Sequence, residues 1–226
     1  MRALNRKLGR DLWHMRGQAL AIALIVASGI ASFVTARSAY DSLWRSHEDY
    51  YARYRFADVF ASLKRAPMSL IGKIAAIPGV EVLEPRVVLG VTLDVPDLDD
   101  PASARLASLP EHGLPNLNRL HIQKGRYLDA SRLNEVLLGS AFAEANRLTP
   151  GSRLSALING RWQELEVVGV ALSPEYIFDM PTQGLLPDKR RFGTIWMSER
   201  AVAEAFDMDG AFNDIALRLG PGAVEA

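Results

Sequence analysis

The sequence predicts an α+β protein with an N-terminal transmembrane helix that extends as a stalk, followed by a mixed α+β extracytoplasmic domain. Two observations predict this fold class. Residues 17–36 contain no charged side chain, and at about 1.5 Å per residue a helix of this length spans the roughly 30 Å hydrocarbon core of a bilayer. From residue 57 onward, short β-type runs alternate with turn residues and short helical patterns, which predict a strand-helix-strand lobe and a β-rich lobe.

Residues 1–16 predict a cytoplasmic amphipathic segment. Leucines and a methionine recur there at steps of three or four residues, and arginines occupy the other faces of the predicted helix. Such a helix suits the surface of the cytoplasmic membrane, where anionic headgroups attract basic side chains. The alternative is a plain basic topology signal with no amphipathic role.

The charges that flank the apolar segment predict its direction. The basic residues that precede it are Arg2, Arg6, Lys7, Arg10 and Arg16, and only Asp11 opposes them. Positive loops stay cytoplasmic, so we expect a cytoplasmic N-terminus and an extracytoplasmic main domain. A cleaved signal peptide is the competing interpretation, but its apolar core would be shorter and a small-residue cleavage site would follow.

The helical pattern continues beyond the predicted transmembrane helix at 17–36, which indicates a stalk over residues 37–55. Aromatic and apolar residues fall there at three- or four-residue steps, and an unbroken helix over 17–55 would be about 60 Å long. Tyr40 and Trp44 fit either this stalk or an aromatic belt at the headgroups. Tyr51 and Tyr54 lie further along, so we expect them to pack on a neighbouring helix or on the following domain.

The first lobe reads as strand, helix, strand. A strand is predicted over 57–63 and a helix over 68–77, where Pro67 suits the helix start and Pro78-Gly79 ends the helix. Residues 80–95 are predicted as extended chain. Residues 95–118 contain four prolines and clustered acids, so we expect a loop or irregular excursion there.

The second lobe is predicted to be rich in strands. Strands are expected over 120–128 and 135–139, a helix over 140–148, and a hairpin of 153–158 with 162–172 through Asn159-Gly160. After a turn-rich stretch at 173–193, the pattern predicts a strand at 194–198, a helix at 199–206 and a strand at 212–220. Because the chain stops just after a strand, we expect the front part of a longer polypeptide, with residues 56–226 as an incomplete domain.

Composition excludes several classes of function. Lys plus Arg and Asp plus Glu each number 26, and leaving out the first sixteen residues gives 21 basic against 25 acidic residues, a net charge of −4. The part of the chain after residue 16 is thus mildly acidic and offers no basic stripe that could bind nucleic acid. The chain has no cysteine, which excludes disulfides and thiolate metal sites.

No motif predicts catalytic, cofactor-binding or metal-binding residues. The sequence lacks a phosphate-binding loop, a G-x-S-x-G elbow and an H-E-x-x-H pair. Asp97, Asp99 and Asp100 sit beside turn prolines and are interpreted as solvated turn residues. The DMDG run at 207–210 lacks the spacing of a calcium loop and predicts a helix-to-strand turn.

A set of ordered motifs carries a resemblance to a known family. A basic start and one membrane helix precede IAAIPGVEVLEPRVV, then KGRYL, and then NEVLLGSAFAEANRLTPGSRLSALINGRWQELEVVGVAL. The chain resembles the FtsX-like, MacB-type permeases of ABC transporters over nearly its whole length. The positions that match the family's extracytoplasmic core domain are Gly125, Arg126, Glu135, Val136, Leu137, Leu138, Pro150, Gly151, Ser152, Val167, Val168, Gly169 and Val170.

The resemblance implies a permease subunit with no ATPase activity of its own, in which mechanotransmission is the function. An ATP-binding ABC subunit, a second permease subunit, and a periplasmic adaptor or a lipid or lipoprotein substrate are the implied partners. The family has three further membrane helices, which this sequence lacks. Two alternatives stay open: a single-span anchored periplasmic interaction domain without transport activity, and an anchored hydrolase that uses acids such as Asp97 or Glu175.

Overall fold

The computed structural model describes residues 15–129, 131–176 and 188–223 of the chain. Residues 1–50 and 51–226 form two separate compact units. The amphipathic helix predicted for residues 1–16 and the middle of the turn-rich stretch predicted at 173–193 lie outside the described residues.

The first element is a long helix, α2 (Arg16–Arg53), of 38 residues, which corresponds to about 57 Å at 1.5 Å per residue. It agrees with the helix predicted over 17–55, and it is long and apolar enough to cross a membrane. Within its apolar run, the Ser28 hydroxyl donates to the Ile25 carbonyl at 2.8 Å. Arg37 pairs with Asp41 one turn later, and the Tyr40 and Trp44 rings stack at 6.3 Å.

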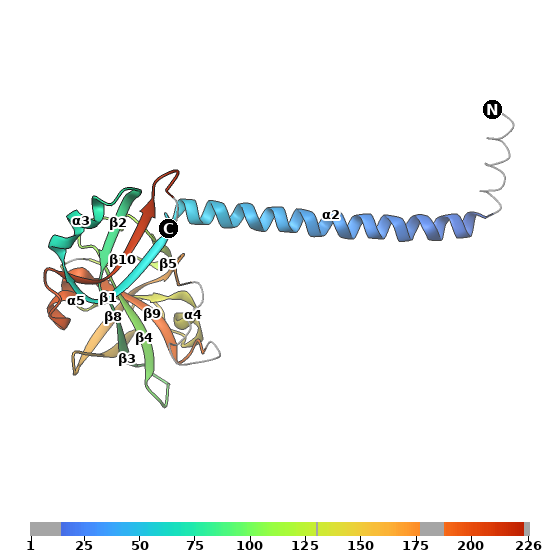
Figure 1. The fold of residues 1–226 in the computed structure, drawn as a ribbon. Coiled ribbons are helices and arrows are strands. Elements are labelled where there is room, and N and C mark those ends of the chain that lie inside the picture. Colours follow the sequence, from blue (N-terminus) through green and yellow to red (C-terminus); the bar gives the residue numbers. More distant parts are fainter. Residues whose placement is uncertain (1–14, 130, 177–187, 224–226) are drawn as a thin grey trace. The chain divides into compact units, whose positions relative to one another are not determined.

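A three-stranded antiparallel sheet forms the smaller part of the second unit (Figure 1). Its order is β1 (Val59–Pro67), β10 (Ala211–Leu219) and β2 (Val80–Arg86). A short turn of helix, η1 (Met68–Leu70) and α3 (Ile71–Ala75), packs Ile71 and Ile74 against a cluster centred on Phe212 and Ile215. This is the predicted strand-helix-strand lobe, completed by the last strand of the chain.

Six further strands close into a ring. They are β3 (Val88–Asp94), β4 (Ala102–Leu109), β6 (Glu135–Gly139), β7 (Arg153–Ile158), β8 (Arg161–Leu172) and β9 (Phe192–Ser198). The sheet runs β8-β6-β9-β4-β3-β7, and β7 pairs again with β8 through the Asn159-Gly160 hairpin. We call this ring the barrel; closure leaves its strands without free edges, and β5 (His121–Gly125) adds to β8 from outside.

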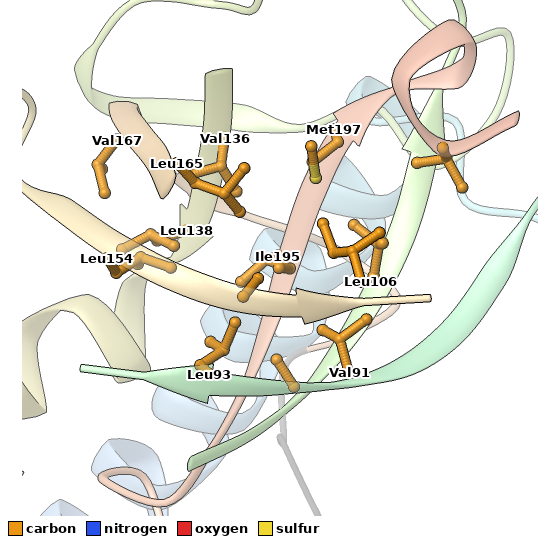
Figure 2. Close-up of a cluster of buried hydrophobic side chains, with 14 of the residues drawn as sticks. Val91, Leu93, Leu106, Val136, Leu138, Leu154, Leu165, Val167, Ile195 and Met197 are labelled. Atoms are coloured by element: carbon orange, nitrogen blue, oxygen red, sulfur yellow. The ribbon is translucent and has the colours of Figure 1, made fainter. Parts of the chain in front are cut away.

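The barrel is filled by alternate side chains of its strands. On β4, Ala102, Ala104 and Leu106 point inward, as the two-residue period of a strand requires. Figure 2 shows this core with its residues Val91, Leu93, Leu106, Val136, Leu138, Leu154, Leu165, Val167, Ile195 and Met197. The interior is a packed hydrophobic core.

Two short helices connect the strands where the sequence predicts them. Helix α4 (Ser140–Ala145) follows β6 and buries Phe142. Helix α5 (Glu199–Phe206) begins after Ser198, whose hydroxyl accepts a hydrogen bond from the Ala201 amide at 3.3 Å, and ends at Asp207 in the left-handed conformation. The DMDG run is therefore the predicted helix-to-strand turn.

The prediction for residues 95–118 is wrong in part, because β4 lies inside the expected loop. The prolines at 96, 101, 110 and 115 flank the strand rather than interrupt it, and small alanines and serines hide its alternating pattern. The extended chain predicted over 80–95 is also two strands in two sheets, since only Val87 separates β2 from β3.

Gly169→Ala is expected to destabilise the barrel, whereas Gly90→Ala is not. A Cβ at Gly169 would lie 2.5 Å from the Arg126 carbonyl oxygen and 2.8 Å from Leu137, whereas one at Gly90 meets nothing within 4 Å. We expect a loss of about 1–3 kcal/mol in the free energy of unfolding for Gly169→Ala and a change within about 0.5 kcal/mol for Gly90→Ala. Urea unfolding followed by fluorescence measures both changes. Equal losses of stability in the two variants would contradict the close backbone contact at Gly169.

Candidate functional site

The segment that follows the long helix is held to the second unit by the backbone. We call residues 54–57 the neck. The carbonyl of Tyr54 accepts a hydrogen bond from the Arg119 amide at 2.8 Å, and that of Arg55 accepts one from the Asn118 amide at 3.0 Å. The amide of Ala57, which is 1% exposed, donates to the Asn118 side-chain oxygen at 3.0 Å. A single short segment, 118–119, therefore holds the neck within the second unit.

Aromatic rings support these hydrogen bonds. The Tyr54 ring meets His121 edge-on at 5.7 Å, and the Tyr51 ring meets Phe56 at 4.5 Å. Phe56 in turn contacts Phe60 of β1. The prediction that Tyr54 packs on the following domain is confirmed, because its partner His121 begins β5.

The Arg86 guanidinium lies at the point where the chain passes from the small sheet to the barrel. Its terminal nitrogens donate to both carboxylate oxygens of Glu175, just beyond β8, and its Nε donates to Asp214 of β10 at 2.7 Å. All three side chains are nearly buried, with exposed fractions of 11%, 12% and 9%. Such a pair requires good geometry to offset the loss of hydration, and here the forked guanidinium supplies it.

Asn118 connects this ion network to the neck. Its side-chain nitrogen donates to Glu175 at 3.0 Å while its side-chain oxygen accepts from the Ala57 amide. At the other end of the network, the Ser62 hydroxyl of β1 donates to Asp214 at 2.6 Å. We call the residues Ser62, Arg86, Asn118, Glu175 and Asp214 the joint; it links the neck, the small sheet and the barrel.

The Arg86 charge is stable in this setting. Burial alone would lower the pKa of the Arg86 guanidinium, but the hydrogen bonds to Glu175 and the charges of Glu175 and Asp214 together raise that pKa. Arg86 therefore stays protonated at every pH at which the domain is folded, and its ring contact with Phe60 at 5.7 Å covers the remaining face of the guanidinium.

A second ion pair, with a buried carboxylate and a half-exposed guanidinium, involves two motif residues of the resemblance. Glu135 has a fully buried side chain and accepts hydrogen bonds from Arg126, one of them at 2.7 Å, and from the Asp129 amide at 2.9 Å. Gly125 and Gly169 face each other across β5 and β8, and Gly125 has a φ of +77° that disfavours other residues. The motif therefore builds the β5-β8-β6 seam and presents no reactive group.

The acids singled out from the sequence are dispersed. Asp97 occupies a turn with φ of 63°, and Asp100 pairs with Arg191 at 2.7 Å, so both are turn residues as predicted. Glu175 belongs to the joint, where the Arg86 guanidinium binds both of its carboxylate oxygens. Over the residues that the structure describes, no three His, Asp or Glu side chains gather as a metal site.

The sequence prediction missed Arg86, Asn118 and Asp214. A signal for Arg86 existed, since it is a charged residue within the apolar run VEVLEPRVVLGV, and a charge in such a run needs a buried partner. Its partners come from 89 and 128 residues along the chain, so no local pattern identifies them.

Several solved structures are similar to this chain. No protein-family model and no curated protein matches the chain. The extracellular domain of the noncanonic ABC-type transporter YknZ from Gram-positive bacteria is 13% identical with a TM-score of 0.46, and the match covers 72% of this chain and 83% of that one. The periplasmic region of MacB from Actinobacillus actinomycetemcomitans is 13% identical with a TM-score of 0.41, over 70% and 67%.

Arg86→Met is expected to destabilise the domain strongly. The substitution leaves Glu175 and Asp214 buried without their cation, which costs about 3–5 kcal/mol in the free energy of unfolding. The matched control is Arg153→Met, which removes an ion pair to Glu164 whose side chains are 69% and 64% exposed; we expect a loss below about 1 kcal/mol there. Chemical denaturation of both variants measures the difference, and similar losses would refute the importance of the joint.

Glu135→Gln is expected to remove an acid-sensitive part of the stability. The hydrogen bonds from Arg126 lower the pKa of Glu135 below its ordinary value of 4.5, and they outweigh the opposing effect of burial. The ionised Glu135 side chain therefore contributes its full stabilisation above pH 4.5. This contribution is lost as the pH falls through the lower pKa that Glu135 has in the folded state. Unfolding free energies from neutral to acidic pH should fall less steeply in Glu135→Gln than in the wild type, whereas Glu164→Gln should follow the wild type.

Proposed function

We propose that this chain is the permease subunit of an ABC transporter. In this proposal it couples the ATP-driven motion of a partner nucleotide-binding subunit to an extracytoplasmic domain, for export or extraction of an envelope substrate. Residues 1–16 lie on the cytoplasmic surface, 17–36 cross the inner membrane, 37–55 form the stalk, and 56–226 form a MacB-like periplasmic core domain. The ordered motifs of the sequence support this assignment.

Charge and hydropathy support the orientation. The apolar run of α2 carries basic residues on its N-terminal side, and such residues remain in the cytoplasm. The N-terminal side therefore faces the ATP-binding subunit, and the domain with the joint faces the periplasm.

The connection through the neck is the observation that carries the proposal. Three hydrogen bonds fix residues 54, 55 and 57 to the segment 118–119, and the Asn118 side chain continues to Glu175 and Arg86. A displacement of the neck therefore acts on both sheets through paired, nearly buried groups rather than through a loose linker. Rigid packed elements of this kind transmit motion, whereas a flexible linker absorbs it.

The partners follow from the proposed role. ATP hydrolysis takes place in a separate ABC subunit, a second permease subunit completes the membrane part, and a periplasmic adaptor or a lipid or lipoprotein substrate meets the outer domain. Purification of the natural protein from membranes in mild detergent should therefore yield an ABC ATPase, identified by mass spectrometry. Purification without an ATPase would favour the alternative of an anchored interaction domain without transport activity.

Glu48→Pro is expected to uncouple the domain from ATP hydrolysis. Residue 48 lies in the interior of α2, where proline removes a hydrogen bond and kinks the helix at a cost of about 3 kcal/mol. The chain lacks cysteine, so His112→Cys introduces a single site for a fluorescent label. The His112 side chain is 95% exposed and lies six residues before Asn118 in the sequence. In the purified complex, ATP should change the emission of this label.

The control for this experiment is Glu48→Ala, which keeps the helix and removes the same carboxylate. We expect the nucleotide-dependent emission change to persist in Glu48→Ala and to disappear in Glu48→Pro, while both variants insert into the membrane and retain the ATPase. An unchanged signal in Glu48→Pro would contradict transmission along the stalk.

A further inference from the structure

A carboxylate on the small sheet holds the loop that binds the neck. The loop comprises residues 110–119, and its Asn116 amide donates to the Glu84 carboxylate of β2 at 2.9 Å. Leu117 follows Asn116, precedes Asn118 and is 1% exposed. Glu84 therefore holds the backbone two residues before the one that clamps Ala57.

Glu84 lies in a polar cavity between the two sheets. The cavity measures about 30 Å³ and is also lined by Arg86, Glu175, Tyr176 and Glu199. A cavity of this size has room for about one water molecule. Glu199, the first residue of α5, therefore faces the same small space from the helix that joins the barrel to β10.

The positive charge near this cavity is already engaged. Arg86 is bound by Glu175 and Asp214. Its charge lowers the pKa of the Glu84 carboxylate, but this effect is smaller than the opposing effect of burial. The other charged or titratable neighbours are Glu111 of the loop, which acts on Glu199, and the Tyr127 hydroxyl, on which Glu84 acts. Glu84 and Glu199 thus meet more negative than positive charge.

The cavity raises the pKa of both carboxylates. Burial raises the pKa of Glu84 above its ordinary value and outweighs the hydrogen bonds from Asn116. Burial raises the pKa of Glu199 as well, with the charges of Glu111 and Glu84 adding to the effect. An open loop would return both groups to water and to ordinary pKa values, so protons bind the closed loop more tightly than the open one, and acid favours closure.

We propose that Glu84 and Glu199 form a proton-sensitive latch on the neck-binding loop, closed in mild acid and loosened as the pH rises. The latch regulates the joint, and its consequence for coupling rests on the proposed permease function. At neutral or alkaline pH, the two ionised carboxylates repel each other across the cavity and the loop releases the neck more often. In mild acid, one proton removes that repulsion while Arg86 keeps its bonds to Glu175 and Asp214.

Hydrogen exchange of the full-length chain in detergent tests the latch. Amides of Ala57, Asn118 and Arg119 report the closed loop, because each donates a hydrogen bond across the neck. After correction for the intrinsic exchange rate, we expect their protection to be severalfold higher at about pH 5.5 than at about pH 8 in the wild type. The Val167 amide, which donates to Ser152 within the barrel seam, should show no such change.

Variants separate the latch from a general effect of pH. In Glu84→Gln with Glu199→Gln, protection should be high at both pH values, whereas Glu81→Gln, an exposed residue of the same strand, should behave as the wild type. Equal wild-type protection at the two pH values, or a dependence that survives the double substitution, would overturn the latch. The measurement needs no ATPase or substrate. A result that overturns the latch therefore leaves the permease proposal standing, and a result that overturns the permease proposal leaves the latch standing.

Discussion

The buried guanidinium of Arg86 is the group on which the arrangement of the domain depends. It sits at the end of β2, one residue before the chain enters the barrel, and it binds a carboxylate from beyond β8 and another from β10. A hydrophobic residue of similar size would fill the space, yet it would not fix the angle between the two sheets. The forked pair with Glu175 and the Nε bond to Asp214 instead fix the directions from which the two carboxylates approach.

The barrel supplies the rigid body that the joint needs. Closure through β7 and β8 removes free edges, and the β5-β8-β6 seam brings backbones so close that Gly169 admits no side chain. Arg126 and Glu135 secure the outside of this seam. The residues that carry the family resemblance are therefore structural, which explains why they identify a fold and no chemistry.

Most elements were predictable because their patterns are local. The charge-free run of α2, the Asn159-Gly160 hairpin and the 199–206 helix each contain their own signal. Strand β4 was not predictable from the sequence. Its alanines and serines differ little in hydrophobicity, and the prolines on either side of it are typical of loops. The joint was not predictable either, because Arg86, Glu175 and Asp214 meet only after both sheets have formed. Long-range polar contacts of this kind leave no periodic pattern.

A double-mutant cycle between Arg86→Met and Asn118→Ala tests the central claim most directly. The two side chains do not need to touch to be coupled, because both bind Glu175. If the joint acts as one unit, the losses in the free energy of unfolding are non-additive, with an interaction energy of about 0.5–3 kcal/mol. If the losses add within about 0.3–0.5 kcal/mol, the neck and the ion network are independent, and motion of the neck has no defined path to the barrel.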